Sequence, residues 1–236
     1  MNYAIIAAGN GSRLAAEGVE YPKPLVPVCG KPMIGRLIDI FRDCGAESVC
    51  VIVNEAMTDV ARYLNELVQS IPELRVVVKS TPDSMHSFHE LAPLLPHGKF
   101  ILTTVDTIFR PEEFRRYAEA FAADAVADGF MAVTDYIDDE KPLYIGVGSD
   151  MRITAFSDEP LPGQIYISGG IYGLRSPGAI DILQRCIDAG QGRMRNYQRA
   201  LVAAGLDLRA WPFDKILDVD HAGDIVKAQQ FLNCDQ

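Results

Sequence analysis

The first residues of the chain constrain its fold more than any other segment. Within residues 2–8, an uninterrupted apolar run extends from Tyr3 to Ala8, which is typical of a strand that is buried on both faces of a parallel sheet. The run leads directly into a loop over residues 7–13 that contains Gly9, Gly11 and Arg13. In an open α/β sheet, ligands bind at the carboxyl ends of the strands. We therefore predict an α/β sheet whose ligand site starts at this loop.

Apolar and turn residues further along the chain predict strands that alternate with helices. In the first half we expect strands at residues 48–53, 74–78 and 100–105, and helices at 32–43, 56–70, 84–95 and 111–123. In the second half we expect short strands at 130–136, 144–147, 152–156 and 164–174, helices at 177–189 and 194–204, a last strand at 207–219 and a final helix at 222–232. This order predicts a Rossmann-like α/β fold, with a doubly wound, mixed, mainly parallel sheet and a small antiparallel insertion on the substrate side.

The composition is that of a soluble globular protein, with 48% hydrophobic and 23% charged residues in a chain of 236. No segment approaches the ~20 consecutive apolar residues that a membrane-spanning helix needs. No basic segment precedes the first strand, as it would in a secretory signal. We expect a single domain over residues 1–236, without a membrane partner and with a cytoplasmic location.

The charge and the cysteines exclude further classes. The net charge of −10 and the lack of a Lys/Arg cluster argue against nucleic acid as a partner. The sequence is compatible with a homo-oligomer as well as with a monomer. The five cysteines are scattered and include no Cys-x-x-Cys pair. We therefore expect ordinary reduced cysteines, and neither a disulfide framework nor a zinc site.

The glycine loop has the features of a phosphate-binding segment. Gly9 and Gly11 let the backbone approach a phosphate closely, and Arg13 adds a charged fork that suits phosphate oxygens. Lys23 lies between two prolines, which hold the backbone extended and present the ammonium group from a stiff segment. Taken alone, the glycines also fit a plain turn, and the prolines also fit a connector with a solvated lysine.

The two segments together carry a resemblance to a known family. The pattern Gly9-x-Gly11-x-Arg13, followed by Pro-Lys23-Pro-Leu-x-Pro-x-x-Gly-Lys-Pro-Met-Ile, resembles the signature of the sugar-phosphate nucleotidyltransferases. That family transfers a nucleoside monophosphate from an NTP to a phosphorylated acceptor and releases pyrophosphate. The resemblance implies that Arg13 holds the β- and γ-phosphates. It also implies that Lys23 neutralises charge on the α-phosphate during attack, in a chemistry dominated by positioning and charge. Ala7 and Ala8 would open the nucleotide-binding loop.

Carboxylates near strand ends predict a magnesium site. Asp106 ends the segment Lys99-Phe-Ile-Leu-Thr-Thr-Val-Asp106, which includes the predicted strand, and a carboxylate at that end of a buried strand points into the ligand crevice. Triphosphate oxygens with one or two carboxylates are the usual ligands of Mg²⁺, and the family places its metal aspartate here. Asp218 and Asp220 alternate in the last predicted strand, so both can face one side. We favour Asp220 as the second ligand, with Asp218 next, and expect Asp224 to serve the dipole of the final helix.

The match weakens at the nucleobase. Residues 79–88 lie where the family reads the base, but Lys79 and Ser84 stand where many members carry glutamine and glycine. Ser84 is therefore either a nucleotide contact or the cap of the following helix. His86 and His89 lie three residues apart at a polar helix start, which is a weak pattern for zinc. The base is not determined.

The acceptor segment also departs from the family. Residues 167–172 resemble its Gly-Ile-Tyr strand, whose glycine, here Gly170, lets the acceptor lie against the backbone. Many members carry Glu-Lys-Pro just before it, and here Glu159 replaces that lysine. Either Lys141 or Arg195 provides the missing cation, or the acceptor is not the usual hexose 1-phosphate, or this segment is simply a solvated turn.

We therefore expect a nucleotidyltransferase domain, with a nucleotide-binding half at about residues 1–128 and an acceptor half at about 129–236. Its partners would be an NTP and a phosphorylated small molecule, with a sugar 1-phosphate favoured as the acceptor and Mg²⁺ as the cofactor. One alternative is a cytidylyltransferase that acts on phosphocholine or a similar small phosphorylated alcohol. The other is a non-catalytic regulatory protein that binds nucleotide sugars, although a sensor needs no metal-bound triphosphate.

Overall fold

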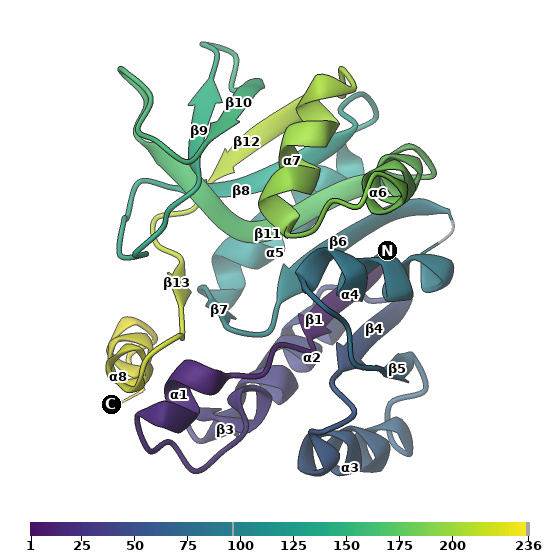
Figure 1. The fold of residues 1–236 in the computed structure, drawn as a ribbon, viewed down its shortest axis with the longest axis vertical. Helices are drawn as coiled ribbons and strands as arrows, with labels where there is room; N and C mark the ends of the chain where they lie inside the picture. The colour runs from purple at the N-terminus through teal and green to yellow at the C-terminus, as the bar shows by residue number, and fades with distance from the viewer. Residues whose placement is uncertain (96, 235–236) are drawn as a thin grey trace.

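One nine-stranded sheet runs through the molecule (Figure 1), and the computed structural model describes the chain over residues 1–95 and 97–234. Its four strands from the first half of the chain lie side by side in the order β6, β1, β4, β5, and all are parallel. Their bounds are Asn2–Ala7 for β1, Ser48–Val53 for β4, Leu74–Val78 for β5 and Gly98–Thr104 for β6. The carboxyl ends of these strands therefore meet along one edge, as the sequence predicts.

The strands of the second half extend this same sheet. The long strand β11 (Tyr166–Ser176) pairs antiparallel with β6, β8 (Gly129–Thr134) and β9 (Tyr144–Val147), and β9 pairs with β10 (Ile153–Ser157). The edge strand β12 (Leu208–Pro212) is parallel to β8. The mixed, mainly parallel sheet is confirmed, with its antiparallel strands joined to the parallel ones by β11.

Helices cover both faces of the sheet, so the doubly wound arrangement is confirmed. One face packs on α2 (Met33–Asp43), α3 (Thr58–Val68) and α5 (Pro111–Ala123), and the other on α4 (Ser84–Leu91), α6 (Gly178–Asp188) and α7 (Met194–Ala203). The alternation within β1 explains this division, because Tyr3 and Ile5 belong to the first core and Ala4 and Ile6 to the second.

The predicted face of α2 shows how local pattern becomes packing. Met33, Ile34, Leu37, Ile38 and Phe41 are all buried, as their helical spacing requires. The helix ends at Asp43, and the next glycine has a φ of 70°, which a glycine adopts without strain.

Two predicted elements differ from the structure. The last strand, expected over 207–219, is two strands, because the chain turns after β12 and resumes as β13 (Leu217–Asp218), which pairs with β7 (Thr107–Ile108). The helix expected over 84–95 ends at Leu91 and continues as a short 3-10 turn over Ala92–Leu94. Pro93 lies in that turn, where it removes a backbone donor.

A third, smaller core stands beside the sheet. It joins α1 (Ser12–Ala16), the hairpin of β2 (Pro27–Val28) and β3 (Lys31–Pro32), and α8 (Ala222–Phe231) through apolar residues that include Leu14, Val28, Val219 and Phe231. Figure 1 shows α8 beside α1, far from it in sequence. This core therefore ties the glycine loop to the end of the chain.

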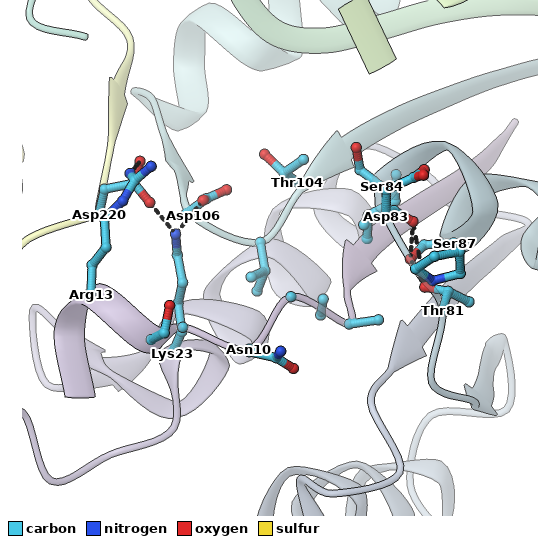
Figure 2. A pocket seen from close by; sticks show the side chains of 18 residues that line it. Asn10, Arg13, Lys23, Thr81, Asp83, Ser84, Ser87, Thr104, Asp106 and Asp220 are labelled. Carbon is cyan, nitrogen blue, oxygen red and sulfur yellow. Dashed lines mark hydrogen bonds and ion pairs between the residues drawn. The ribbon is translucent and has the colours of Figure 1, made fainter. Parts of the chain in front are cut away.

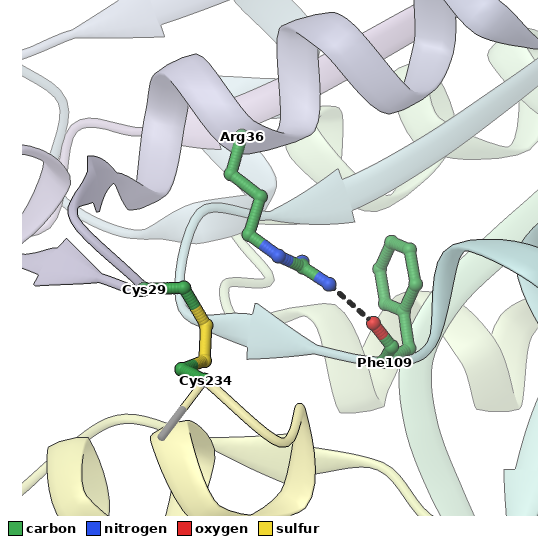
Figure 3. Close-up of a disulfide and its surroundings, with 4 residues drawn as sticks. All are labelled: Cys29, Arg36, Phe109 and Cys234. Carbon is green, nitrogen blue, oxygen red and sulfur yellow. Dashed lines mark hydrogen bonds between the residues drawn. A yellow bond between two sulfur atoms is a disulfide. The ribbon is translucent and has the colours of Figure 1, made fainter. Parts of the chain in front are cut away.

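The cysteine prediction was wrong for two residues. Cys29 in the hairpin and Cys234 after α8 form a disulfide, with their Cα atoms 5.2 Å apart and a separation of 205 positions in sequence (Figure 3). Packing of α8 on the hairpin brings the two together, which no local spacing reveals. In the same region the half-buried Arg36 donates a hydrogen bond to the Phe109 carbonyl at 2.5 Å, and the protein around its guanidinium group lowers its pKa to about 10. The other three cysteines are free.

Within the described residues, none of the helices is long and apolar enough to cross a membrane.

Candidate active site

The carboxyl ends of β1 and β6 open onto a cavity of about 410 Å³, the first cavity (Figure 2). Nine of the residues predicted from sequence line it together: Ala7, Ala8, Gly9, Gly11, Arg13, Lys23, Ser84, Asp106 and Asp220. They come from the glycine loop, the proline-flanked segment, the start of α4 and two strand ends. One concave site thus collects most of the predicted nucleotide and metal residues.

Gly11 is the point at which the loop and Lys23 meet. Its φ is 60°, and a Cβ atom there would lie 2.8 Å from the Cβ of Lys23. Only a glycine therefore allows the two segments this close approach. Lys23 begins the 3-10 turn Lys23–Leu25, whose backbone is restricted by the prolines on either side of it.

Asn54 supports the loop from the neighbouring strand. Its side-chain amide donates to the carbonyl of Ala8 at 3.3 Å and to Asn10 Oδ1 at 3.1 Å. Our sequence prediction missed this buried residue. The available signal was its place, since it is the first polar residue after β4 at the edge where ligands bind.

Lys23 lies between two carboxylates (Figure 2). Its Nζ atom is 2.5 Å from Asp106 Oδ2 and 2.7 Å from Asp220 Oδ1, and its side chain is only 11% exposed. Burial alone would lower the pKa of this ammonium, but the two carboxylates raise it to about 12. Arg13 Nη1 also contacts Asp220, at 2.7 Å from Oδ2. Burial acts to raise the pKa of Asp220, and the two cations hold it below its usual value.

Asp218, the other predicted metal ligand, lies two residues before Asp220 and is outside the ion pairs of Lys23. Its side chain lines a second cavity, and the residue as a whole is exposed. Desolvation of the carboxyl group by the protein nevertheless raises its pKa to about 8, and the nearby charge of Asp106 raises it further. Among the described residues, no group of three or more His, Cys, Asp or Glu side chains is arranged to hold a metal ion. The arrangement that can receive a cation is the pair Asp106 and Asp220, because both already contact one ammonium.

The nucleobase segment differs in detail from the prediction. Asp83, and not Ser84, caps α4, since its Oδ1 accepts from the N–H groups of Met85 and His86 at 2.9 and 3.1 Å. Ser84 is thereby left facing the first cavity. Lys79 does not line that cavity and pairs with Glu90 at 2.8 Å.

The second cavity, of about 560 Å³, lies beside β11, β13 and the start of α8. Arg13 and Asp220 line both cavities, so the two meet at these side chains. Ser168 and Gly169 line the second one. Gly170, the predicted acceptor contact, is absent from the described lining of either cavity, although Gly169 beside it lines the second one.

The second cavity contains both cationic residues that we predicted as replacements for the missing lysine. Arg195 and Lys141 line it, and Arg195 donates to the Lys141 carbonyl at 3.2 Å. Asp158 forms ion pairs with Arg195 and with Arg199, the latter at 2.6 Å. Glu159 is exposed and does not contribute to the described lining.

The N-terminus of α8 is held by two carboxylates. Asp224 Oδ2 accepts from the backbone N–H groups of Asp220 and His221 at 3.2 and 2.8 Å, as expected for a residue that serves the helix start. Glu17 at the end of α1 accepts from the Ala222 N–H at 2.7 Å and contacts His221 Nδ1 at 2.5 Å. The hydrogen bond to His221 lowers the pKa of Glu17. Glu17, which our prediction missed, thereby links α1, which carries Arg13, to the start of α8, which Asp220 precedes.

Comparison with known proteins decides the family. Residues 3–161 match the family model of the MobA-like NTP transferase domain. The chain belongs to this family. The matched part of the chain includes the glycine loop, Lys23, Ser84 and Asp106, while Asp220 and Arg195 lie beyond it. The resemblance to nucleotidyltransferases is thus confirmed.

The curated relatives of this chain are distant. It is 28% identical to the CMP-5'-(3-aminopropyl)phosphonate synthase of Streptomyces rubellomurinus, over 58% of this chain and 24% of that protein. It is 22% identical to the bifunctional protein GlmU of Methanococcus maripaludis, over 99% of this chain and 55% of that protein. The chain therefore spans about a quarter and about half of the length of these two relatives.

Solved structures share its fold. The inositol-1-phosphate CTP transferase from T. maritima superposes with a TM-score of 0.78 at 17% identity, over 99% of this chain and 95% of that chain. A candidate glucose-1-phosphate thymidylyltransferase from Bacillus anthracis gives a TM-score of 0.83 at 18% identity, over 98% and 95%. At these identities the likeness establishes the fold alone.

Proposed function

We propose that this NTP transferase moves a nucleoside monophosphate from an NTP to a phosphorylated small-molecule acceptor and releases pyrophosphate. The observation that carries the proposal is the meeting of two cavities at Arg13 and Asp220, with Lys23 at the junction. The NTP occupies the first cavity and the acceptor the second. The half before about residue 128 binds the nucleotide, and the half after it binds the acceptor.

The roles follow from position and charge. The backbone from Ala7 to Gly11 approaches the triphosphate, and Arg13 contacts its β- and γ-phosphates. Lys23 neutralises charge on the α-phosphate as the acceptor oxygen attacks in line and pyrophosphate leaves. Ser84 contacts the nucleoside from the far side of the cavity.

Magnesium fits the carboxylates that are present. Asp106 and Asp220 would hold the ion, because both direct an oxygen at one point that a cation already occupies. Triphosphate oxygens would complete the shell. Asp218 is the second choice for the metal ligand, and it lines the cavity proposed for the acceptor. When bound, the ion supplies neutralisation of phosphate charge.

We propose Arg195 as the contact to the acceptor phosphate. Its guanidinium group lines the second cavity and is held by Asp158, which also pairs with Arg199. A guanidinium group suits phosphate oxygens at least as well as the lysine that this chain lacks.

The second cavity favours one alternative acceptor beside a sugar 1-phosphate, namely a phosphate or phosphonate that also carries an amine. The lining has more carboxylates than cations: Asp138, Asp139, Glu140, Asp218, Asp220 and Asp224 against Arg13, Lys141, Arg195 and Lys227. An excess of negative charge favours a cationic group on the ligand. The name of the Streptomyces relative, with its aminopropyl phosphonate, supports the same choice.

Pyrophosphate release tests the proposal. The four NTPs, with CTP first, are assayed with magnesium against hexose 1-phosphates, inositol 1-phosphate, phosphocholine and aminoalkyl phosphonates. We expect release with one NTP and one acceptor class, and product identity follows from mass spectrometry. Silence over the whole panel, together with binding of a nucleotide diphosphate product, would instead favour a non-catalytic regulatory protein.

A further inference from the structure

We propose that the Lys23 ammonium holds the place of the metal ion in the nucleotide-free protein, and that the ion binds well only when a triphosphate draws Lys23 away. This inference rests on the proposed function, since it assigns the metal to Asp106 and Asp220. Its basis is geometric. One buried ammonium lies 2.5 Å from an oxygen of the first carboxylate and 2.7 Å from an oxygen of the second (Figure 2).

The charges at this point already balance. Asp106 and Asp220 carry two negative charges, and Lys23 and Arg13 bring two positive ones into contact with them. A divalent ion that arrives without a triphosphate is repelled by the Lys23 ammonium, which is in direct contact with both carboxylates. Lys23 and Asp106 are only 11% and 19% exposed, so solvent screens this repulsion less than it would at the surface.

Lys23 can leave only if another anion receives it. A buried ammonium that loses its partners is costly, because neither water nor protein then compensates its charge. The triphosphate is an anion of the right kind, and the glycine loop that would hold it is adjacent. The Lys23 backbone stays in place, since it lies against Gly11 and between prolines. The movement is therefore a swing of the flexible side chain from the carboxylates to the phosphate.

Two consequences follow for binding. A metal ion alone binds weakly to the wild-type protein, because Lys23 competes for the same two oxygens. A triphosphate and a metal ion raise each other's affinity by the same factor, as linkage requires.

Metal binding to Lys23 variants tests the inference without any turnover. The affinity for Mn²⁺ alone is measured by electron paramagnetic resonance of the free ion, for wild type, Lys23→Met and Lys23→Arg. Lys23→Met removes the charge and keeps the length, and Lys23→Arg keeps the charge. We expect Lys23→Met to bind Mn²⁺ at least about tenfold more tightly than wild type, and Lys23→Arg to bind it weakly.

A double variant and a thermal measurement complete the design. In Lys23→Met with Asp106→Asn the gain in Mn²⁺ affinity should disappear. Lys23→Met leaves Asp106 without its cation and Asp220 with Arg13 alone, so Mn²⁺ should also raise its melting temperature more than that of wild type. If Lys23→Met binds Mn²⁺ no better than wild type, or if the gain survives Asp106→Asn, the inference is overturned. The proposed function would fail differently, through the absence of pyrophosphate release.

Discussion

Replacement of Gly11 by alanine tests how the loop positions Lys23. At a φ of 60° an alanine is strained, which costs about 1–2 kcal/mol of folding free energy. Its Cβ would also lie 2.8 Å from the Lys23 Cβ, an atom fixed to the backbone. One of the two segments must therefore move by roughly 1 Å, because carbon atoms in ordinary contact lie about 3.5–4.0 Å apart. A displacement of about 1 Å at a reacting centre can reduce the rate ~10²-fold.

Gly18→Ala is the matched control. Gly18 also has a positive φ, 83°, but a Cβ there meets no atom within 4 Å. Both variants should lose about 1–2 kcal/mol of unfolding free energy in urea titrations, while only Gly11→Ala should lose kcat, by about 10²-fold. Turnover would be followed by pyrophosphate release at saturating substrates. If Gly11→Ala keeps the turnover of Gly18→Ala, the contact between Gly11 and Lys23 does not set the position of Lys23 for catalysis.

Three further changes have defined outcomes. Asp106→Asn should abolish magnesium-dependent pyrophosphate release and leave the circular dichroism spectrum unchanged; a variant that only melts earlier would return this residue to a structural role. Tyr117→Phe should lower the unfolding free energy by about 1 kcal/mol at unchanged kcat, because the buried hydroxyl donates to the Phe130 carbonyl at 2.7 Å; wild-type stability in urea would contradict this. Reduction of the Cys29–Cys234 disulfide should lower stability by about 2–5 kcal/mol, since it closes a loop of 205 residues. Identical urea curves with and without dithiothreitol would count against a stabilising disulfide.

Much of the fold was readable from the sequence because its signals are local. The strands at 48–53 and 74–78 and the helix at 111–123 have the bounds that the apolar pattern predicts. The glycine loop and Asp106 were readable for the same reason, since each lies within two residues of the carboxyl end of a buried parallel strand. In such a sheet, the end of a strand is enough to place a residue at the ligand edge.

Tertiary structure alone decided which distant side chains meet. Asp218 and Asp220 are equivalent by strand alternation, but only Asp220 contacts Lys23, because β13 pairs with β7 and the chain then turns into α8. Packing of α8 on the hairpin likewise joined Cys29 to Cys234. Such contacts depend on how whole elements pack, and no residue pattern within one segment encodes them. The sequence by itself determined the sheet and the position of the glycine loop at its ligand edge, while packing brought residues 217–234 against that loop.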